Sequence, residues 1–146
     1  MPKVYGFDTG FVSFARGWDP LRPEDYGVLW EHVVLEHIQA HLPDMTVRYW
    51  RNKAGREIDF VLVHPRDRVD TIECKWNPAD FDPAALEIFR VRYPRGKNYL
   101  VTPQCGHAFV RRFDKMQVTV CNPVGLGVAS ASSPAGFSTS TKLDTR

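Results

Sequence analysis

Two neighbouring stretches of the chain alternate polar and apolar residues and together predict a β-hairpin. They are residues 56–63 and 71–75, and both place β-branched or aromatic side chains between charged ones. Residues 64–68 join them and contain a proline and an aspartate, which are typical of turns.

A three-residue loop at residues 65–67 would fix the register of this hairpin, with Asp59 opposite Glu73 and Glu57 opposite Lys75. Directly opposed residues share a sheet face, with Cβ atoms about 4.5–5.5 Å apart. Two carboxylates therefore meet beside a lysine. Like charges in that position are destabilising unless a cation lies between them, and hard divalent cations bind carboxylate oxygens.

The alternative is an ordinary solvated hairpin face. A register shifted by one residue would place Asp59 and Glu73 on opposite faces of the sheet, and no shared site would form.

A helix is predicted at residues 24–42 from apolar residues recurring at helical spacing. Its apolar stripe is centred on Glu31, while His32 falls on the polar side. A carboxylate in a buried stripe is costly unless it is paired or bound to a cation. Glu31 is therefore a candidate ligand, with a salt bridge to Lys75 or to an arginine, or simple exposure, as the alternatives. The remaining polar residues expected at the surface of this helix are Glu36, His37 and His41.

The other predicted elements are strands at residues 3–7, 46–51, 98–102, 108–110 and 116–120, and a second helix at residues 83–93. Asp82 suits the cap of that second helix, and Asp8 fits a cap better than a ligand. The fold expected is α/β, with a mixed central sheet of about four or five strands flanked by helices on both sides. We expect one domain at residues 1–124 and a flexible tail, rich in Gly, Ser, Thr and Ala, at residues 125–146.

Composition places the chain among globular proteins, with 43% hydrophobic and 12% aromatic residues. The three cysteines show no CxxC spacing, which indicates a reducing compartment and argues against a disulfide framework or a zinc site. The sequence contains neither a signal peptide nor an 18-residue apolar run. We therefore expect a cytoplasmic protein with no membrane association.

The formal net charge is only +2, but basic residues cluster in the second part of the chain. Such clusters can contact nucleic-acid phosphates or can be ordinary solvated surface, and the sequence favours neither reading. The near-neutral total favours a docking module over a strong nucleic-acid binder. Tyr49 and Trp50 lie in one basic run and could stack on bases, although we expect them in the core. The candidate nucleic-acid-binding residues are Arg51, Lys53, Arg56, Arg90, Arg92, Arg95, Lys97, Arg111 and Arg112.

The acidic residues are of the kind that binds divalent metal ions. Asp59 and Glu73 would hold Mg²⁺ or Mn²⁺ together with the main-chain carbonyl of Cys74, and Glu31 would complete the shell directly or through water. A metal-bound water can become a nucleophile. Lys75 shares the face of Glu73 and can orient that water or stabilise developing phosphate charge.

In this element order, Glu31, Asp59 and residues 73–75 resemble the PD-(D/E)xK nuclease superfamily, which includes restriction endonucleases and Holliday-junction resolvases. Residues 2–10, 49–60 and 72–76 are similar to a domain of unknown function that usually sits at the C-terminus of bacterial and archaeal AAA-type ATPases. The resemblance covers roughly residues 2–120. Ile58 stands where the superfamily name has proline, and the chain has no GxxxxGK[ST] phosphate loop.

The resemblance implies a restriction-endonuclease-like αβββαβ core in which Glu31, Asp59, Glu73 and Lys75 are catalytic. It implies a Mg²⁺-dependent deoxyribonuclease acting on DNA, with an ATPase domain or partner outside this chain, and it allows for a homodimer. The second hypothesis is a catalytically silent nucleic-acid-binding or protein-docking module of an ATPase system.

Overall fold

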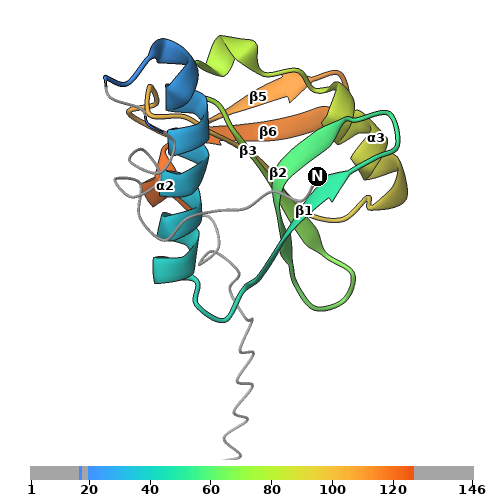
Figure 1. Cartoon of the computed structure of the whole chain (residues 1–146). Helices are drawn as coiled ribbons and strands as arrows, with labels where there is room; N and C mark the ends of the chain where they lie inside the picture. Colours follow the sequence, from blue (N-terminus) through green and yellow to red (C-terminus); the bar gives the residue numbers. More distant parts are fainter. Residues whose placement is uncertain (1–16, 18–19, 127–146) are drawn as a thin grey trace, which may run out of the picture.

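The fold is seen in a computed structural model that describes residue 17 and residues 20–126. Within these residues, one mixed sheet of six strands runs in the order β1-β2-β3-β4-β6-β5 (Figure 1). The strands are β1 (Thr46–Arg51), β2 (Glu57–Val63), β3 (Val69–Cys74), β4 (Asn98–Val101), β5 (Phe109–Phe113) and β6 (Met116–Cys121). The helices are η1 (Pro23–Asp25), α2 (Tyr26–His41), η2 (Pro78–Asp80) and α3 (Ala84–Arg92).

The sheet confirms the expected α/β class but is larger than the four or five strands predicted. Strands β1, β2 and β3 form an antiparallel meander, whereas β3, β4 and β6 are parallel. The extra width arises because β5 pairs with β6 as an antiparallel edge strand of the same sheet. The connection from β3 to β4 passes through α3, as parallel neighbours require.

The β2–β3 hairpin has the register that the sequence predicts. Phe60 pairs with Ile72, and the N–H of His64 bonds to the carbonyl of Arg68 at 2.9 Å. Arg66 and Asp67 turn the chain with φ of 62° and 57°. The pairing ends at Phe60 and Ile72, so Asp59 and Glu73 are the next residues of the two strands toward the end of β3.

A β-bulge interrupts the pairing of β1 with β2 beside Asp59. Arg48 pairs with Val61 but Trp50 pairs with Ile58, so Tyr49 alone faces two residues of β2. Bulges increase local twist and redirect side chains, and they are frequent next to functional sites. This bulge sits in β2 at residues 59–60.

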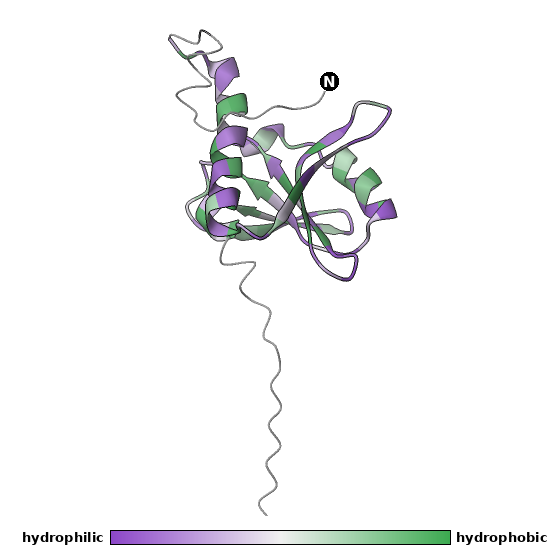
Figure 2. Ribbon diagram, turned by 60° about the horizontal axis from the view of Figure 1, so that its bottom comes forward, coloured by the Kyte–Doolittle hydropathy of each residue, from purple (hydrophilic) through white to green (hydrophobic). Residues whose placement is uncertain are grey.

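The two helices cover opposite faces of the sheet. Trp30, Val34 and Ile38 of α2 pack into one buried cluster, which includes Phe60 and Ile72. A second cluster, on the other face, contains Leu86 and Phe89 of α3 with Ile58, Leu100 and Val120. Hydrophobic and hydrophilic residues alternate along α2, and the inner strands are largely hydrophobic (Figure 2).

The placement of His32 corrects the helical-face prediction for α2. Its side chain is buried, at 3% exposure, instead of lying on a polar surface. Its Nδ1 lies 2.8 Å from the carbonyl oxygen of Val28, so one ring nitrogen has a partner within the helix. Of the residues expected at the surface, His41 is exposed, while Glu36 and His37 are half-buried. The predicted strand at residues 3–7, Asp8 and nearly all of the predicted tail lie outside the described residues.

Candidate functional site

Asp59, Glu73 and Lys75 meet where β3 ends. Both carboxylates are buried, with 4% and 6% of the residue exposed. Asp59 Oδ2 accepts a hydrogen bond from the N–H of Cys74 at 2.8 Å, and Lys75 Nζ lies 3.6 Å from Glu73 Oε2. Lys75 is one residue beyond the strand, but its N–H still bonds to the carbonyl of Val101 at 3.1 Å. These hydrogen bonds therefore hold the backbone of Cys74 and Lys75 in place.

The electrostatics of this group show an excess of negative charge. Burial and the charge of Asp59 raise the pKa of Glu73 to about 8, against a weaker opposing effect of Lys75. Burial alone would lower the pKa of Lys75, but the charges of Asp59 and Glu73 outweigh it and raise that pKa. The lysine stays protonated, while the Glu73 carboxyl holds its proton near neutral pH.

Glu31 reaches the same end of β3 from α2, on the opposite face of the sheet from α3. It is half-buried and lines a pocket of about 310 Å³ together with Cys74, Lys75 and Trp76. A smaller pocket of about 200 Å³ adjoins it and is lined by Glu73 and Lys75. Lys75 thus lies between the two pockets. The charge of Glu31, like those of Asp59 and Glu73, contributes to the raised pKa of Lys75. The four predicted catalytic residues therefore lie in one region.

The donor chemistry of this region suits a hard divalent cation, because its side chains offer carboxylate oxygens. In the described part of the chain, however, no group of three or more His, Cys, Asp or Glu side chains is arranged to hold a metal ion. The Cys74 side chain packs in the α2-side core, where burial raises its pKa well above the ordinary value. Ligation by Glu31, Asp59, Glu73 and the Cys74 carbonyl stays a prediction.

The sequence reasoning missed Asp80. This exposed residue of η2 lines both pockets, together with Lys75. The turn that presents it is fixed by Asn77, whose Oδ1 accepts from the N–H of Ala79 at 3.0 Å. The signal available was the Asn-Pro-Ala-Asp segment directly after Lys75 and Trp76, a typical turn with an acid at its end.

The predicted basic residues of segments 51–56 and 90–97 lie at opposite ends of the sheet, whereas Arg111 and Arg112 are on β5. Arg56 lines the smaller pocket and lies 3.9 Å from Asp82, Arg51 ends β1, and Lys53 lies in the β1–β2 connection. The 90–97 group lies at the other end, where the N–H of Val69 bonds to the carbonyl of Arg95 at 3.0 Å. The two groups form separate basic runs in the sequence, and the fold keeps them apart by the length of β3.

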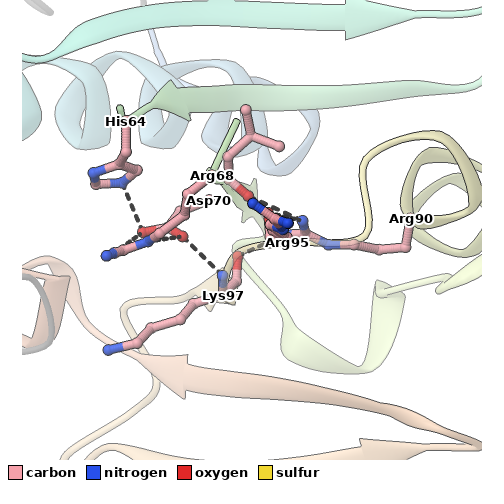
Figure 3. Close-up of polar contacts among 7 residues, drawn as sticks. His64, Arg68, Asp70, Arg90, Arg95 and Lys97 are labelled. Carbon is pink, nitrogen blue, oxygen red and sulfur yellow. Dashed lines mark hydrogen bonds and ion pairs between the residues drawn. The ribbon is translucent and has the colours of Figure 1, made fainter. Parts of the chain in front are cut away.

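Arg90 has a structural role that argues against phosphate contact. Its guanidinium donates to Asn98 Oδ1 at 2.7 Å and to four carbonyl oxygens between 2.8 and 3.1 Å away, those of Val69, Tyr93, Arg95 and Lys97. Figure 3 shows Arg90 beside Arg95 and Lys97. Five protein acceptors surround the guanidinium, one at Nε, three at Nη1 and one at Nη2, so its donors are largely engaged within the protein. Arg90 therefore ties the end of α3 to the start of β3 and β4.

Asp70 anchors the same end of the sheet. Its carboxylate accepts from Arg68 Nη2 at 3.0 Å and from the N–H of Lys97 at 2.8 Å, and it lies 2.8 Å from His64 Nε2 (Figure 3). Burial alone would raise the pKa of Asp70, but these partners outweigh it and lower that pKa. The pKa of Asp70 is therefore lowered, whereas that of Glu73, at the other end of β3, is raised.

With this geometry in place, comparison with family models gives one decisive match. Residues 26–120 match the family described as "Domain of unknown function (DUF4143)". The chain belongs to this family. The match begins at the first residue of α2 and ends one residue before the end of β6, so it includes Glu31, Asp59, Glu73 and Lys75.

Among solved structures, the chain is similar to one in the refined half-complex from the tetradecameric assembly of Thermococcus gammatolerans McrB AAA+ hexamers with bound McrC. The identity is 14% and the TM-score 0.49, over 66% of this chain and 27% of that one. This chain therefore matches about a quarter of the length of that protein. The comparison with curated proteins gave no match. Among the described residues, no helix is both long and apolar enough to cross a membrane.

Proposed function

We propose that this member of the family is a metal-dependent nuclease that hydrolyses phosphodiester bonds of DNA, with a restriction-endonuclease-like site at the end of β3. The observation that carries the proposal is the buried and interacting pair of carboxylates, Asp59 and Glu73, beside Lys75. Such a pair is unfavourable on its own, and a bound cation would relieve the repulsion. Strongly perturbed acids in a cleft are also characteristic of functional sites.

Each residue has a defined task in this proposal. Asp59 and Glu73 would hold Mg²⁺ or Mn²⁺ with the Cys74 carbonyl, and Glu31 would complete the shell. A bound divalent ion supplies Lewis-acid polarisation and a water of lowered pKa. Lys75 keeps its proton and presents positive charge to a phosphate oxygen in the adjoining pocket. Arg56, together with Arg51 and Lys53, would meet the DNA backbone at this end of the sheet.

Calorimetric titration with Mg²⁺ and Mn²⁺, paired with a cleavage assay on duplex, branched and single-stranded DNA, tests the proposal. The parent should bind metal and cut DNA. Glu73→Gln should remove both properties while leaving DNA binding intact, and Lys75→Ala should suppress cleavage without preventing metal binding. Glu87→Gln is the matched control, because Glu87 is an exposed acid of α3 away from both pockets. A parent that neither takes up metal nor cuts any DNA would overturn the proposal.

A catalytically silent DNA-binding or docking module is the second candidate. The Lys75–Glu73 ion pair at 3.6 Å favours it, since the lysine already supplies part of the positive charge that a metal would bring. In this reading the protein works with an ATPase domain or partner, as the family resemblance implies. Calorimetry separates the two candidates, because the docking module predicts no uptake of divalent metal.

A further inference from the structure

We propose that a third pocket, on the α3 side of the hairpin, binds an unpaired base of single-stranded DNA. The pocket has a volume of about 480 Å³, within the range of small-ligand sites. We call it the aromatic pocket and define it by six of its lining residues: Arg48, Tyr49, Trp50, Arg66, Phe89 and Tyr93.

The aromatic rings of this pocket form a continuous surface that is only partly covered. Trp50 meets Phe89 edge-on with ring centroids 5.5 Å apart, and Phe89 meets Tyr93 at 4.8 Å. Phe89 is buried, whereas Tyr49 and Tyr93 are 45% and 37% exposed. The exposure of Tyr49 corrects the expectation that it lies in the core: it sits on edge strand β1 opposite the bulge. Exposed aromatic rings that pack beside a buried aromatic side chain are suited to stacking on a nucleobase.

The charge around the aromatic pocket favours a nucleic acid over an uncharged ligand. Arg48 and Arg66 line it, and Asp67 is the only carboxylate in its lining. Arg95 joins this basic border, since its Nη1 lies 3.4 Å from the carbonyl oxygen of Arg66. A nucleotide of single-stranded DNA offers a base that can stack on an aromatic ring and a phosphate that can bind an arginine.

The position of the aromatic pocket relative to the acids also fits a strand of DNA. Glu57, at the start of β2, lines the pocket that contains Glu73, whereas Val61 and Val63 of the same strand line the aromatic pocket. At about 3.3 Å per residue, the two pockets are roughly 13–20 Å apart along β2. A strand held by one base in the aromatic pocket could extend along β2 to the acids. This inference rests on the proposed function, because the proposed function supplies DNA as the class of ligand.

The test is fluorescence anisotropy in EDTA with three labelled probes of equal length: oligo(dT), an abasic strand and a duplex. Oligo(dT) should bind more tightly than the abasic strand, which keeps every phosphate but has no base to stack. Tyr49→Ala and Tyr93→Ala should each weaken oligo(dT) binding about 5- to 150-fold, as loss of a stacked base predicts, and leave abasic binding unchanged. Arg48→Ala should reduce the dependence of binding on salt.

Phe109→Ala is the matched control, because Phe109 is an exposed aromatic residue, at 51%, on the opposite edge of the sheet. It should bind all three probes like the parent. Equal parent affinity for oligo(dT) and the abasic strand, tighter binding of the duplex, or no binding of DNA would each overturn the inference; the last outcome would indicate a protein partner instead. Base-dependent binding by a parent that takes up no metal would support this site while refuting the nuclease proposal.

Discussion

Asp59 accepts a hydrogen bond from the backbone N–H of Cys74, with 2.8 Å between Oδ2 and the nitrogen. The bond links β2 to the end of β3 and holds the Asp59 carboxylate against the strand that carries Glu73. The backbone therefore holds the Asp59 carboxylate near Glu73, where its charge helps to raise the pKa of Glu73.

Replacing Asp59 by Asn should lower the pKa of Glu73. The amide oxygen can still accept from Cys74, but the negative charge that helps to raise that pKa to about 8 is gone. Burial of Glu73 remains, so we expect a fall that stops above the ordinary value. Carboxyl ¹³C NMR titration measures it, and Asp114→Asn, in the exposed β5–β6 turn, should leave the titration unchanged.

The pH dependence of stability should carry the signature of Glu73. Its pKa is raised on folding, from 4.5 to about 8, so between these values the folded state holds a proton that the unfolded state has lost. The free energy of unfolding should therefore fall as pH rises across this window, by at most about 1.4 kcal/mol per pH unit from this group. Urea denaturation in EDTA at pH 5 and pH 8 measures the change.

Glu73→Gln is the variant that isolates this effect, since it cannot ionise. Its free energy of unfolding should change less between pH 5 and pH 8 than that of the parent, and it should exceed the parent at pH 8. If parent and variant show parallel pH profiles, the pKa of Glu73 is not raised in the folded state. In the nuclease proposal, Mg²⁺ should restore stability to the parent at pH 8 and have no effect on the variant.

Arg90→Ala should destabilise the protein strongly, because five protein acceptors lose their donor. We expect a loss of about 2–4 kcal/mol in the free energy of unfolding, measured by urea denaturation. Arg112→Ala, at an exposed position of β5, should change it by no more than about 0.5 kcal/mol. Equal effects of the two substitutions would contradict the structural role of Arg90.

Gly96→Ala should be among the most damaging small substitutions in the chain. Gly96 has a φ of +133°, and a Cβ there would lie 1.8 Å from the carbonyl oxygen of Val69. Backbone must move to accept it, so we expect a loss of about 3 kcal/mol or more. Gly106→Ala is the control, since a Cβ there has nothing within 4 Å. Thermal denaturation of both variants checks the contrast.

The sequence by itself determined the elements and the register of the central hairpin. Alternation of polar and apolar residues located β2 and β3, and the turn around Pro65 set a pairing that ends at Phe60 and Ile72, directly beside Asp59 and Glu73. These signals are local: the period of a strand and the geometry of a short loop depend on neighbouring residues alone. The α2 helix was predicted equally well from the spacing of its apolar residues, except that His32 is buried.

Only the tertiary structure decided what lies beside these residues. Arg90 and Arg56 look alike in the sequence, but the crossover through α3 places one at each end of the sheet, and carbonyl oxygens of Val69 and of the α3–β4 connection surround Arg90. Asp80 enters the site because η2 folds back over Lys75, and Tyr49 is exposed because β1 is an edge strand with a bulge opposite it. Such placements depend on contacts between residues far apart in the chain, which no local pattern encodes.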